Sequence, residues 1–368
     1  MNRREVLGVL AAVTASGAAA AQSTVESGTQ TAASRAGPRN LITDVEGLRI
    51  GHSNDAEIRT GVTVILPDEA AVTACDIRGG GPASRETDVL KPENLVQKVD
   101  AIVLSGGSVY GLASADGIAA RMGARNQGFA LREAPGIPPS PILPTACLYD
   151  LANGGEKAWG EAPPYRRLGL EALEAVSSDF SLGTVGAGYG ANSGGLKGGL
   201  GSASVVSADG MTVGAVVTVN SLGSAIAPGG KQFWAAPLEM GDEFGGLGSD
   251  ALAAGPDEYR RDTSPRTNTT LACIATDVIL SRVELQRVAI MAQDGMARAL
   301  RPSHAPFDGD IVFALTTGKR VGDEKQLRSV VTMRIGALAA DVLARAIARA
   351  VYEATALTGS NTPAWRDL

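Results

Sequence analysis

The sequence predicts a mixed α/β protein in which strands and helices form layers around one core. Short apolar runs of strand length occur at 61–67, 71–75, 100–104, 213–219 and 311–315. Two long helical patterns lie in the last quarter of the chain. Glycine is frequent, with 46 residues, whereas aromatic residues make up only 4%. This mixture indicates tight turns and close backbone approaches around a core of small aliphatic side chains.

The elements follow one another with short turns between them. Residues 41–50 are expected to form a first strand, followed by the strands 61–67 and 71–75. The buried strand 100–104 runs into a Gly-rich turn, and a helix is expected from there through Met122.

Two helices are expected near the C-terminus. Ser281 and Glu284 form a capping box at the start of the first, and its apolar residues recur with helical period. The second is Ala-rich and extends over about 327–357. Because the only long loose segment precedes Asn268, residues 41–368 are interpreted as a single catalytic domain.

The first residues have the pattern of an export signal. A basic start with Arg3-Arg4 precedes a short apolar stretch and the small residues at 18–21. The arginine pair fits a twin-arginine signal and an ordinary Sec signal equally well. We therefore expect residues 1–21 to be a signal peptide and residues 22–40 a flexible leader. The mature protein is expected to be periplasmic or secreted, without a membrane span.

Charge and composition exclude several classes of function. The net charge of −6 leaves no basic patch for nucleic acid. Three cysteines in apolar contexts, without CxxC spacing, favour buried free thiols: Cys75, Cys147 and Cys273. With only two histidines, His52 and His304, a zinc site built on several histidines is excluded, and a Ser-His-Asp triad would need one of them. We expect no metal and no cofactor.

The most informative stretch is Asn268-Thr269-Thr270. A loose segment rich in glycine and charge ends there, and the apolar run 271–275 begins directly after it. This join suits the nucleophile of a self-cleaving precursor. Cutting the Asn268–Thr269 bond would leave Thr269 with a free amine, of pKa near ~8, beside its own hydroxyl. The tripeptide is also an N-glycosylation pattern, and Thr is common at strand starts. On the tripeptide alone, the ordinary strand start is the simpler interpretation.

Three further places carry polar groups that suit amide chemistry. Lys197 lies in Gly-rich backbone that matches no phosphate-binding motif, and a cation there could tune a neighbouring amine. Asn220 ends a predicted strand and could donate into an oxyanion hole, although it is also an ordinary turn residue. Asp308 and Asp310 form an Asp-Gly-Asp turn without EF-hand spacing. Near a nucleophile, such carboxylates could hold an ammonium group and move protons.

Taken together, these segments resemble the DmpA/BapA-type self-processing peptidases, which include β-aminopeptidases and nylon-oligomer hydrolases. The resemblance covers nearly the whole chain from about Leu41. The matching pieces, in consistent order, are Arg78-Gly-Gly-Gly-Pro82, Arg85-Glu-Thr-Asp88, Leu104-Ser-Gly-Gly-Ser-Val-Tyr-Gly-Leu112, Lys197-Gly-Gly-Leu-Gly201, Val219-Asn220, Asn268-Thr-Thr-Leu271, Ala275-Thr-Asp277, Asp294-Gly-Met-Ala-Arg298 and Asp308-Gly-Asp310.

The resemblance implies an αββα sandwich of the DmpA/ornithine-acetyltransferase type, similar to that of ordinary N-terminal-nucleophile hydrolases but topologically distinct. Members cut themselves once, and the new N-terminal Ser or Thr is the nucleophile. Here this implies Thr269, with chains 22–268 and 269–368 that assemble as a homotetramer. In the nylon-oligomer hydrolases, assisting groups match Lys197, Asn220, Asp308 and Asp310, and a tyrosine of the active-site wall matches Tyr149.

The sequence departs from the β-aminopeptidase branch. That branch uses a serine nucleophile, a Ser-x-Glu pair, and a glutamate near the tyrosine position that holds the free amine of the substrate. This chain has Thr269 and Asp308-Gly-Asp310, and no glutamate within 144–149. The nucleophile and the acidic pair therefore match the nylon-oligomer hydrolases.

We expect an N-terminal-nucleophile hydrolase, an aminopeptidase or amidase activated by cleavage at Asn268–Thr269. It would act on peptides or small amide oligomers through an acyl-enzyme. One alternative is an acyltransferase of the ornithine-acetyltransferase type, in which an amine captures the acyl group. Another is an envelope binding protein without enzymatic activity that is never processed.

Overall fold

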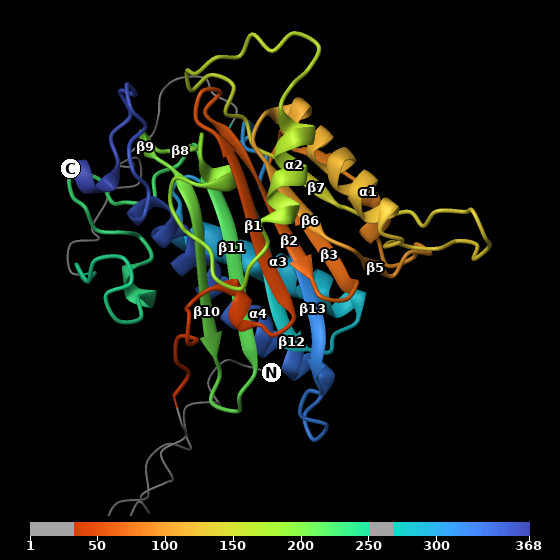
Figure 1. The fold of residues 1–368 in the computed structure, drawn as a ribbon. Coiled ribbons are helices and arrows are strands. Elements are labelled where there is room, and N and C mark those ends of the chain that lie inside the picture. The colour runs from red at the N-terminus through yellow and green to blue at the C-terminus, as the bar shows by residue number, and fades with distance from the viewer. Residues whose placement is uncertain (1–32, 250–267) are drawn as a thin grey trace, which may run out of the picture. The chain divides into compact units, whose positions relative to one another are not determined.

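The computed structural model describes residues 33–249 and 268–368, and Ser34–Leu368 form one compact unit (Figure 1). Two sheets build its centre. The first sheet has the spatial order β1 (Leu48–Asp55), β2 (Thr60–Pro67), β6 (Ile102–Ser105), β7 (Thr145–Cys147) and β4 (Ala83–Arg85). The second has the order β10 (Gly199–Val206), β11 (Thr212–Asn220), β12 (Thr269–Val278), β13 (Ile311–Arg320), β3 (Ala71–Ile77) and β5 (Lys98–Val99).

Helices cover the outer face of each sheet. The first sheet is covered by α1 (Ser114–Ala124) and α2 (Tyr165–Glu174), and the second by α3 (Arg282–Ala299) and α4 (Arg328–Tyr352). A short hairpin, β8 (Asn192–Ser193) and β9 (Leu196–Lys197), lies outside both sheets. The layers are helix, sheet, sheet and helix, so the predicted αββα sandwich is confirmed.

Three hydrophobic clusters correspond to the three interfaces between these layers. Strand β12 contributes side chains to two of these clusters. Leu271 and Cys273 lie in the cluster between the sheets, whereas Ala272 and Ile274 lie in the cluster under α3 and α4. Alternate side chains of a strand point to opposite faces, so a strand buried on both faces is a continuous apolar run.

Glycines let α4 pack directly on β10. A Cβ on Gly201 would lie 2.0 Å from the carbonyl oxygen of Ala346, and one on Gly199 would lie 2.6 Å from that of Ala350. No side chain fits there. The Gly-rich stretch, for which no strand was predicted, is therefore the first half of β10, an edge strand of the second sheet.

Most expected elements are confirmed, among them β2, β3, β6, β11, β13 and the capping box at Ser281. The expected strand at 41–50 is wrong, because Ile42–Asp44 form a 3-10 turn and β1 begins only at Leu48. The carboxylate of Asp44 accepts the Leu41 N–H, which turns the chain there. The last helix ends at Tyr352, five residues before the expected end.

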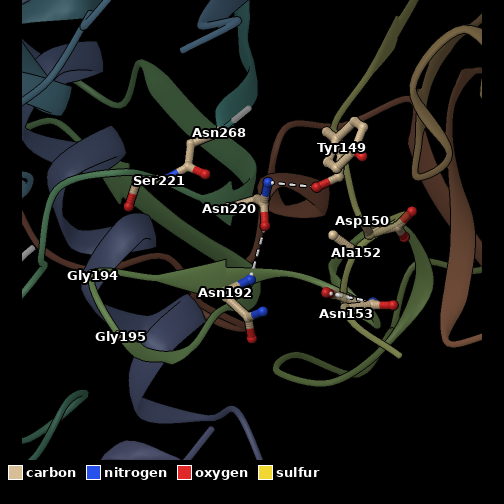
Figure 2. Close-up of a pocket in the computed structure, with 11 residues that line it drawn as sticks. Tyr149, Asp150, Ala152, Asn153, Asn192, Gly194, Gly195, Asn220, Ser221 and Asn268 are labelled. Atoms are coloured by element: carbon tan, nitrogen blue, oxygen red, sulfur yellow. Dashed lines mark hydrogen bonds between the residues drawn. The ribbon is translucent and has the colours of Figure 1, made fainter. Parts of the chain in front are cut away.

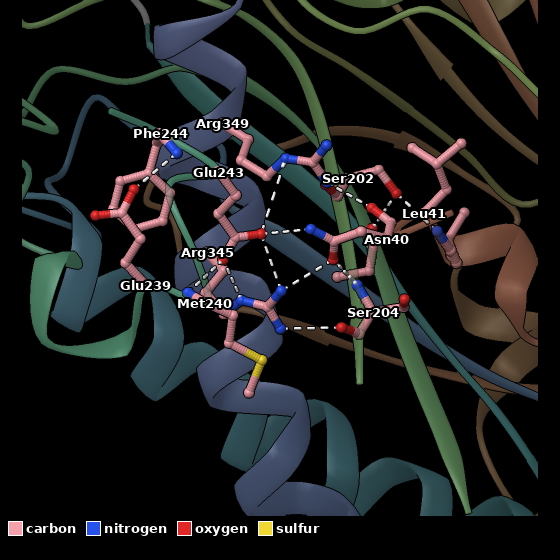
Figure 3. Close-up of polar contacts among 12 residues, drawn as sticks. Asn40, Leu41, Ser202, Ser204, Glu239, Met240, Glu243, Phe244, Arg345 and Arg349 are labelled. Atoms are coloured by element: carbon pink, nitrogen blue, oxygen red, sulfur yellow. Dashed lines mark hydrogen bonds and ion pairs between the residues drawn. The ribbon is translucent and has the colours of Figure 1, made fainter. Parts of the chain in front are cut away.

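A buried ion-pair network joins distant parts of the chain (Figure 3). Arg345 of α4 donates to Glu243 from Nε at 2.5 Å and to the Asn40 side-chain oxygen at 2.9 Å. Asn40 in turn donates to Glu243 at 2.5 Å. Arg35 pairs with Val206 of β10. Residues 34–40, expected in a flexible leader, are thus part of the folded unit.

The expected signal peptide lies outside the described residues, as does most of the expected leader. Within 33–249 and 268–368, no helix is both long and apolar enough to cross a membrane.

Candidate active site

Thr269 is the first residue of β12, at one end of the space between the two sheets. Its side chain is on the same face of the strand as those of Leu271 and Cys273, which lie in the core between the sheets. Across the antiparallel ladder Thr269 pairs with Asn220, the last residue of β11. Both are buried, with exposed fractions of 3% and 5%. The expected nucleophile and the expected oxyanion donor are therefore neighbours.

Hydrogen bonds hold the peptide group between Asn268 and Thr269. Thr269 Oγ1 donates to the Asn268 carbonyl oxygen at 2.5 Å, and the Gly309 N–H donates to the same oxygen at 2.8 Å. The Asn268 N–H donates to the Phe307 carbonyl oxygen at 3.1 Å, so that Asn268 forms a parallel bridge with Asp308. The Gly309 N–H favours addition to the carbonyl carbon, because it stabilises the negative charge that develops on the oxygen.

Asp310 links the strand start to a histidine that the sequence analysis did not assign. Its Oδ1 accepts the Thr270 N–H at 2.7 Å. Its Oδ2 accepts the His304 Nδ1–H at 2.8 Å and the His304 backbone N–H at 3.1 Å. One signal was available, since His304 is one of only two histidines and stands six residues before Asp310.

The surroundings of Asp308 shift the pKa of its carboxyl group. Burial, and then the negative charge of Asp310, raise the pKa of Asp308 to about 6. It remains a carboxylate at neutral pH, but accepts a proton more readily than an ordinary aspartate.

The turn that contains Asp308 and Asp310 packs against the glycines 79–81. The Gly81 N–H donates to the Asp308 carbonyl oxygen at 2.8 Å. A Cβ on Gly79 would lie 2.2 Å from the Asp310 nitrogen. The glycines of the Arg-Gly-Gly-Gly-Pro motif therefore allow its backbone to pack closely against the turn at 308–310.

The orientation of the Asn220 amide follows from its two backbone partners. Its oxygen accepts the Asn192 N–H at 2.9 Å, and its Nδ2 donates to the Tyr149 carbonyl oxygen at 3.1 Å. Since Nδ2 carries two hydrogens, the second is left for another acceptor.

Lys197 is a buried residue of β9. Its ammonium group donates to three carbonyl oxygens, those of Gly188 at 3.1 Å, Ala191 at 2.7 Å and Gly198 at 2.7 Å. Burial lowers the pKa of Lys197 to about 7, and the charge of Asp150 opposes this shift. The ammonium group thus ties together the Gly-rich backbone around Asn192.

A small recess, partly open to solvent, adjoins the junction between Asn268 and Thr269 (Figure 2). It is lined by Tyr149, Asp150, Ala152, Asn153, Gly190, Asn192, Gly194, Gly195, Asn220, Ser221 and Asn268. Figure 2 shows Asn268, Asn220 and Tyr149 around one side of it. The expected wall residue Tyr149 therefore lines the same recess as the residue before the expected nucleophile.

Asp150 is a second buried carboxylate that the sequence analysis missed, although it directly follows Tyr149. It accepts the Thr60 hydroxyl at 2.7 Å and the Gly107 N–H at 2.8 Å. Burial raises its pKa to about 6. These bonds anchor the Ser-Gly-Gly-Ser turn, so that this second family-like motif is held next to the recess.

Among the described residues, no group of three or more His, Cys, Asp and Glu side chains could hold a metal ion. All three cysteines are free thiols, with Cys147 and Cys273 buried and Cys75 partly so. His52 bonds to Thr63 through Nδ1 at 3.0 Å. His304 is therefore the histidine that belongs to this site.

Comparison with known proteins identifies relatives over most of the chain. An uncharacterised aminopeptidase of Mycobacterium tuberculosis is 40% identical over 358 residues, covering 89% of this chain and 98% of that protein. The 6-aminohexanoate-oligomer endohydrolase of Kocuria sp. is 29% identical over 332 residues, covering 85% of this chain and 86% of that protein.

Solved structures share the fold. The β-aminopeptidase of Burkholderia sp. superposes with a TM-score of 0.64 at 23% identity, covering 88% of this chain and 89% of that one. The L-aminopeptidase D-Ala-esterase/amidase of Ochrobactrum anthropi superposes with a TM-score of 0.65 at 21% identity, covering 89% and 90%. The profile of peptidase family S58 matches residues 40–364. The chain therefore belongs to peptidase family S58, the DmpA-type family that its motifs resemble.

Proposed function

We propose that this chain is a self-processing amide hydrolase whose nucleophile is Thr269, with its amino group freed by cleavage after Asn268. The single observation that supports this most directly is the 2.5 Å hydrogen bond from Thr269 Oγ1 to the Asn268 carbonyl oxygen. The hydroxyl lies against the peptide bond that it would cut, and the Gly309 N–H donates to the same oxygen.

Self-cleavage begins when the Thr269 oxygen adds to the Asn268 carbonyl carbon and Asp308 receives the hydroxyl proton. The C–N bond then breaks, the nitrogen takes up that proton, and Asn268 becomes an ester on Thr269 Oγ1. Water hydrolyses the ester, which leaves a carboxyl group on Asn268 and restores the hydroxyl of Thr269. The Gly309 N–H stabilises the negative charge on the carbonyl oxygen in both steps.

In the processed protein, the free amine of Thr269 is the base for its own hydroxyl, since an α-amine has a pKa near ~8. Asp308 and Asp310 orient this amine and tune its protonation. Lys197 acts through the backbone that it ties together. Asn220 donates its second Nδ2 hydrogen to the oxyanion of the substrate.

The substrates we propose are short peptides or linear amide oligomers, which pass through an acyl-enzyme without a cofactor. Tyr149 forms part of the wall that receives them. This class includes what the relatives' names describe, an aminopeptidase and a 6-aminohexanoate-oligomer endohydrolase. Export to the periplasm or beyond, and assembly as a homotetramer, remain predictions from the sequence.

Intact mass of the purified protein under denaturing conditions tests the proposal. We expect two species, one of them spanning Thr269 to Leu368. Thr269→Ala should remain a single chain without activity, and Thr269→Ser should still cleave. Thr270→Val is the matched control, because the buried Thr270 hydroxyl has no hydrogen-bond partner among the described residues.

Two outcomes would overturn the proposal. Cleavage of Thr269→Ala after Asn268 would remove Thr269 as the nucleophile. Preferential transfer of the acyl group to an added amine, rather than to water, would make the protein an acyltransferase.

A further inference from the structure

Two main-chain hydrogen bonds hold Asn268 in the site. Its N–H donates to the Phe307 carbonyl oxygen at 3.1 Å, and its carbonyl oxygen accepts the Gly309 N–H at 2.8 Å. It is thereby paired as one extended residue with Asp308. Asn268 is only 6% exposed and lines the same recess as Tyr149 (Figure 2).

The chemistry makes this arrangement informative about substrates. The ester formed in self-cleavage joins the Asn268 carbonyl carbon to Thr269 Oγ1. An amide substrate with asparagine on its acyl side would give the same linkage at the same oxygen. The groups that hold Asn268 before cleavage are therefore the groups available to hold the acyl residue of a substrate after Asn268 has left.

We propose that the processed enzyme binds the acyl residue of its substrate in the place of Asn268, as an extended L-α-amino acid residue with a short, neutral, polar side chain. This inference rests on the function proposed above and narrows its substrates to α-peptides, so that oligomers of 6-aminohexanoate fall outside them. The substrate nitrogen donates to the Phe307 carbonyl oxygen, and the reacting carbonyl accepts the Gly309 N–H.

The two main-chain bonds select the backbone of the acyl residue. Phe307 and Gly309 flank Asp308, and the N–H and C=O of a single α-amino acid residue reach both of them. A β-amino acid adds one CH₂ group, and thus one more bond of about 1.5 Å, between these atoms. It cannot make both hydrogen bonds with its carbonyl carbon still at Thr269. A D-residue that makes both bonds directs its side chain away from the recess.

The lining of the recess selects the side chain. Neutral amide and hydroxyl groups of Asn192, Asn220 and Ser221 line it together with the side-chain-free Gly194 and Gly195. The only carboxylate there, that of Asp150, is already bonded to Thr60 and Gly107. A large apolar side chain would bury these polar groups without partners, whereas a short polar one can satisfy them.

The test uses the processed enzyme and aminoacyl p-nitroanilides that share one leaving group. We expect kcat/KM for the L-asparaginyl compound to exceed that for the L-leucyl, D-asparaginyl and β-homoasparaginyl compounds by at least about 10-fold, the low end of the discrimination typical of such contacts. A leucyl or β-amino acyl compound that is hydrolysed as fast or faster overturns the inference, while hydrolysis itself leaves the proposed function intact.

A second arm uses the precursor, because both reactions pass through the same kind of ester. Self-cleavage rates of Asn268→Ser and Asn268→Leu should rank as the rates of seryl and leucyl p-nitroanilides do on the processed enzyme, with serine faster in both. Opposite rank orders overturn the inference. Absence of both self-cleavage and amide hydrolysis in the unmodified chain overturns the proposed function as well.

Discussion

Replacing Glu243 with alanine should destabilise the protein strongly, because it leaves a buried cation without its partner. The side chains of Arg345 and Glu243 are 1% and 6% exposed, and their closest atoms are 2.5 Å apart. Removal of one member of such a buried pair typically costs about 3–5 kcal/mol. At roughly 2 °C per kcal/mol for a domain of this size, Tm should fall by roughly 6–10 °C.

The measurement is thermal unfolding in the uncut Thr269→Ala background, so that dissociation of two chains does not enter the transition. The control is Glu353→Ala at the end of the same helix. Glu353 is one-third exposed and pairs with the half-exposed Arg366, so its loss should cost at most about 1 kcal/mol. If Glu243→Ala lowers Tm no more than Glu353→Ala does, the argument from burial is refuted.

The same pair predicts a pH dependence of stability. Burial alone would raise the pKa of Glu243, but the hydrogen bond and charge of Arg345 hold it below its usual value. A carboxyl whose pKa is lower in the folded state contributes stability above the pKa of the unfolded state, near ~4.3. The Tm difference between the parent and Glu243→Ala should therefore shrink as the pH falls below that value.

Three further predictions concern the site and the core. The rate of self-cleavage should fall as the pH drops through about 6, because the pKa of Asp308 is raised to that value and its carboxylate is the proposed base. Asp308→Asn should cleave slowly at every pH, and an unchanged pH profile in that variant would remove Asp308 as the base. His304→Gln should slow self-cleavage less than His304→Ala in timed gel assays, because glutamine can still donate to Asp310 and so hold its carboxylate in place. Equal rates for both variants would contradict a role of this hydrogen bond in positioning Asp310. Gly201→Val should unfold at a lower urea concentration than the parent, because its Cβ would lie 2.0 Å from the Ala346 carbonyl oxygen; an unchanged midpoint would contradict direct packing of α4 on β10.

Local patterns predicted most of the fold because strands buried on both faces are recognisable as continuous apolar runs. The capping box likewise marked the start of α3 at its Ser281 cap. One expected strand was wrong and one strand, β10, was not predicted, each for a physical reason. Asp44 turns the chain by accepting backbone N–H groups, so the apolar residues before β1 do not form a strand. The glycines of β10 serve the close approach of α4, which no pattern local to β10 reveals.

The candidate site was predicted through residue types, and the structure adds the contacts between them. Thr269, Asn220 and the acidic turn lie together because β11, β12 and β13 are adjacent strands whose relevant ends meet. Lys197 has hydrogen bonds to backbone carbonyls, which spacing along the chain could not indicate. His304 was missed because its role depends on a turn that brings it back to Asp310.

The parallel bridge between Asn268 and Asp308 would give the proposed self-processing a purpose beyond freeing an amine. While the chain is intact, Asn268 occupies the two main-chain groups, the Phe307 carbonyl and the Gly309 N–H, that an incoming amide would need. Edge groups of a strand accept another extended segment only when they are unpaired. The proposed cleavage after Asn268 would turn this residue from a covalently held occupant into a product that can leave. On this argument, the cut that creates the nucleophile also opens the binding site, and a precursor that cannot cut should bind substrate analogues weakly even though its side chains are in place.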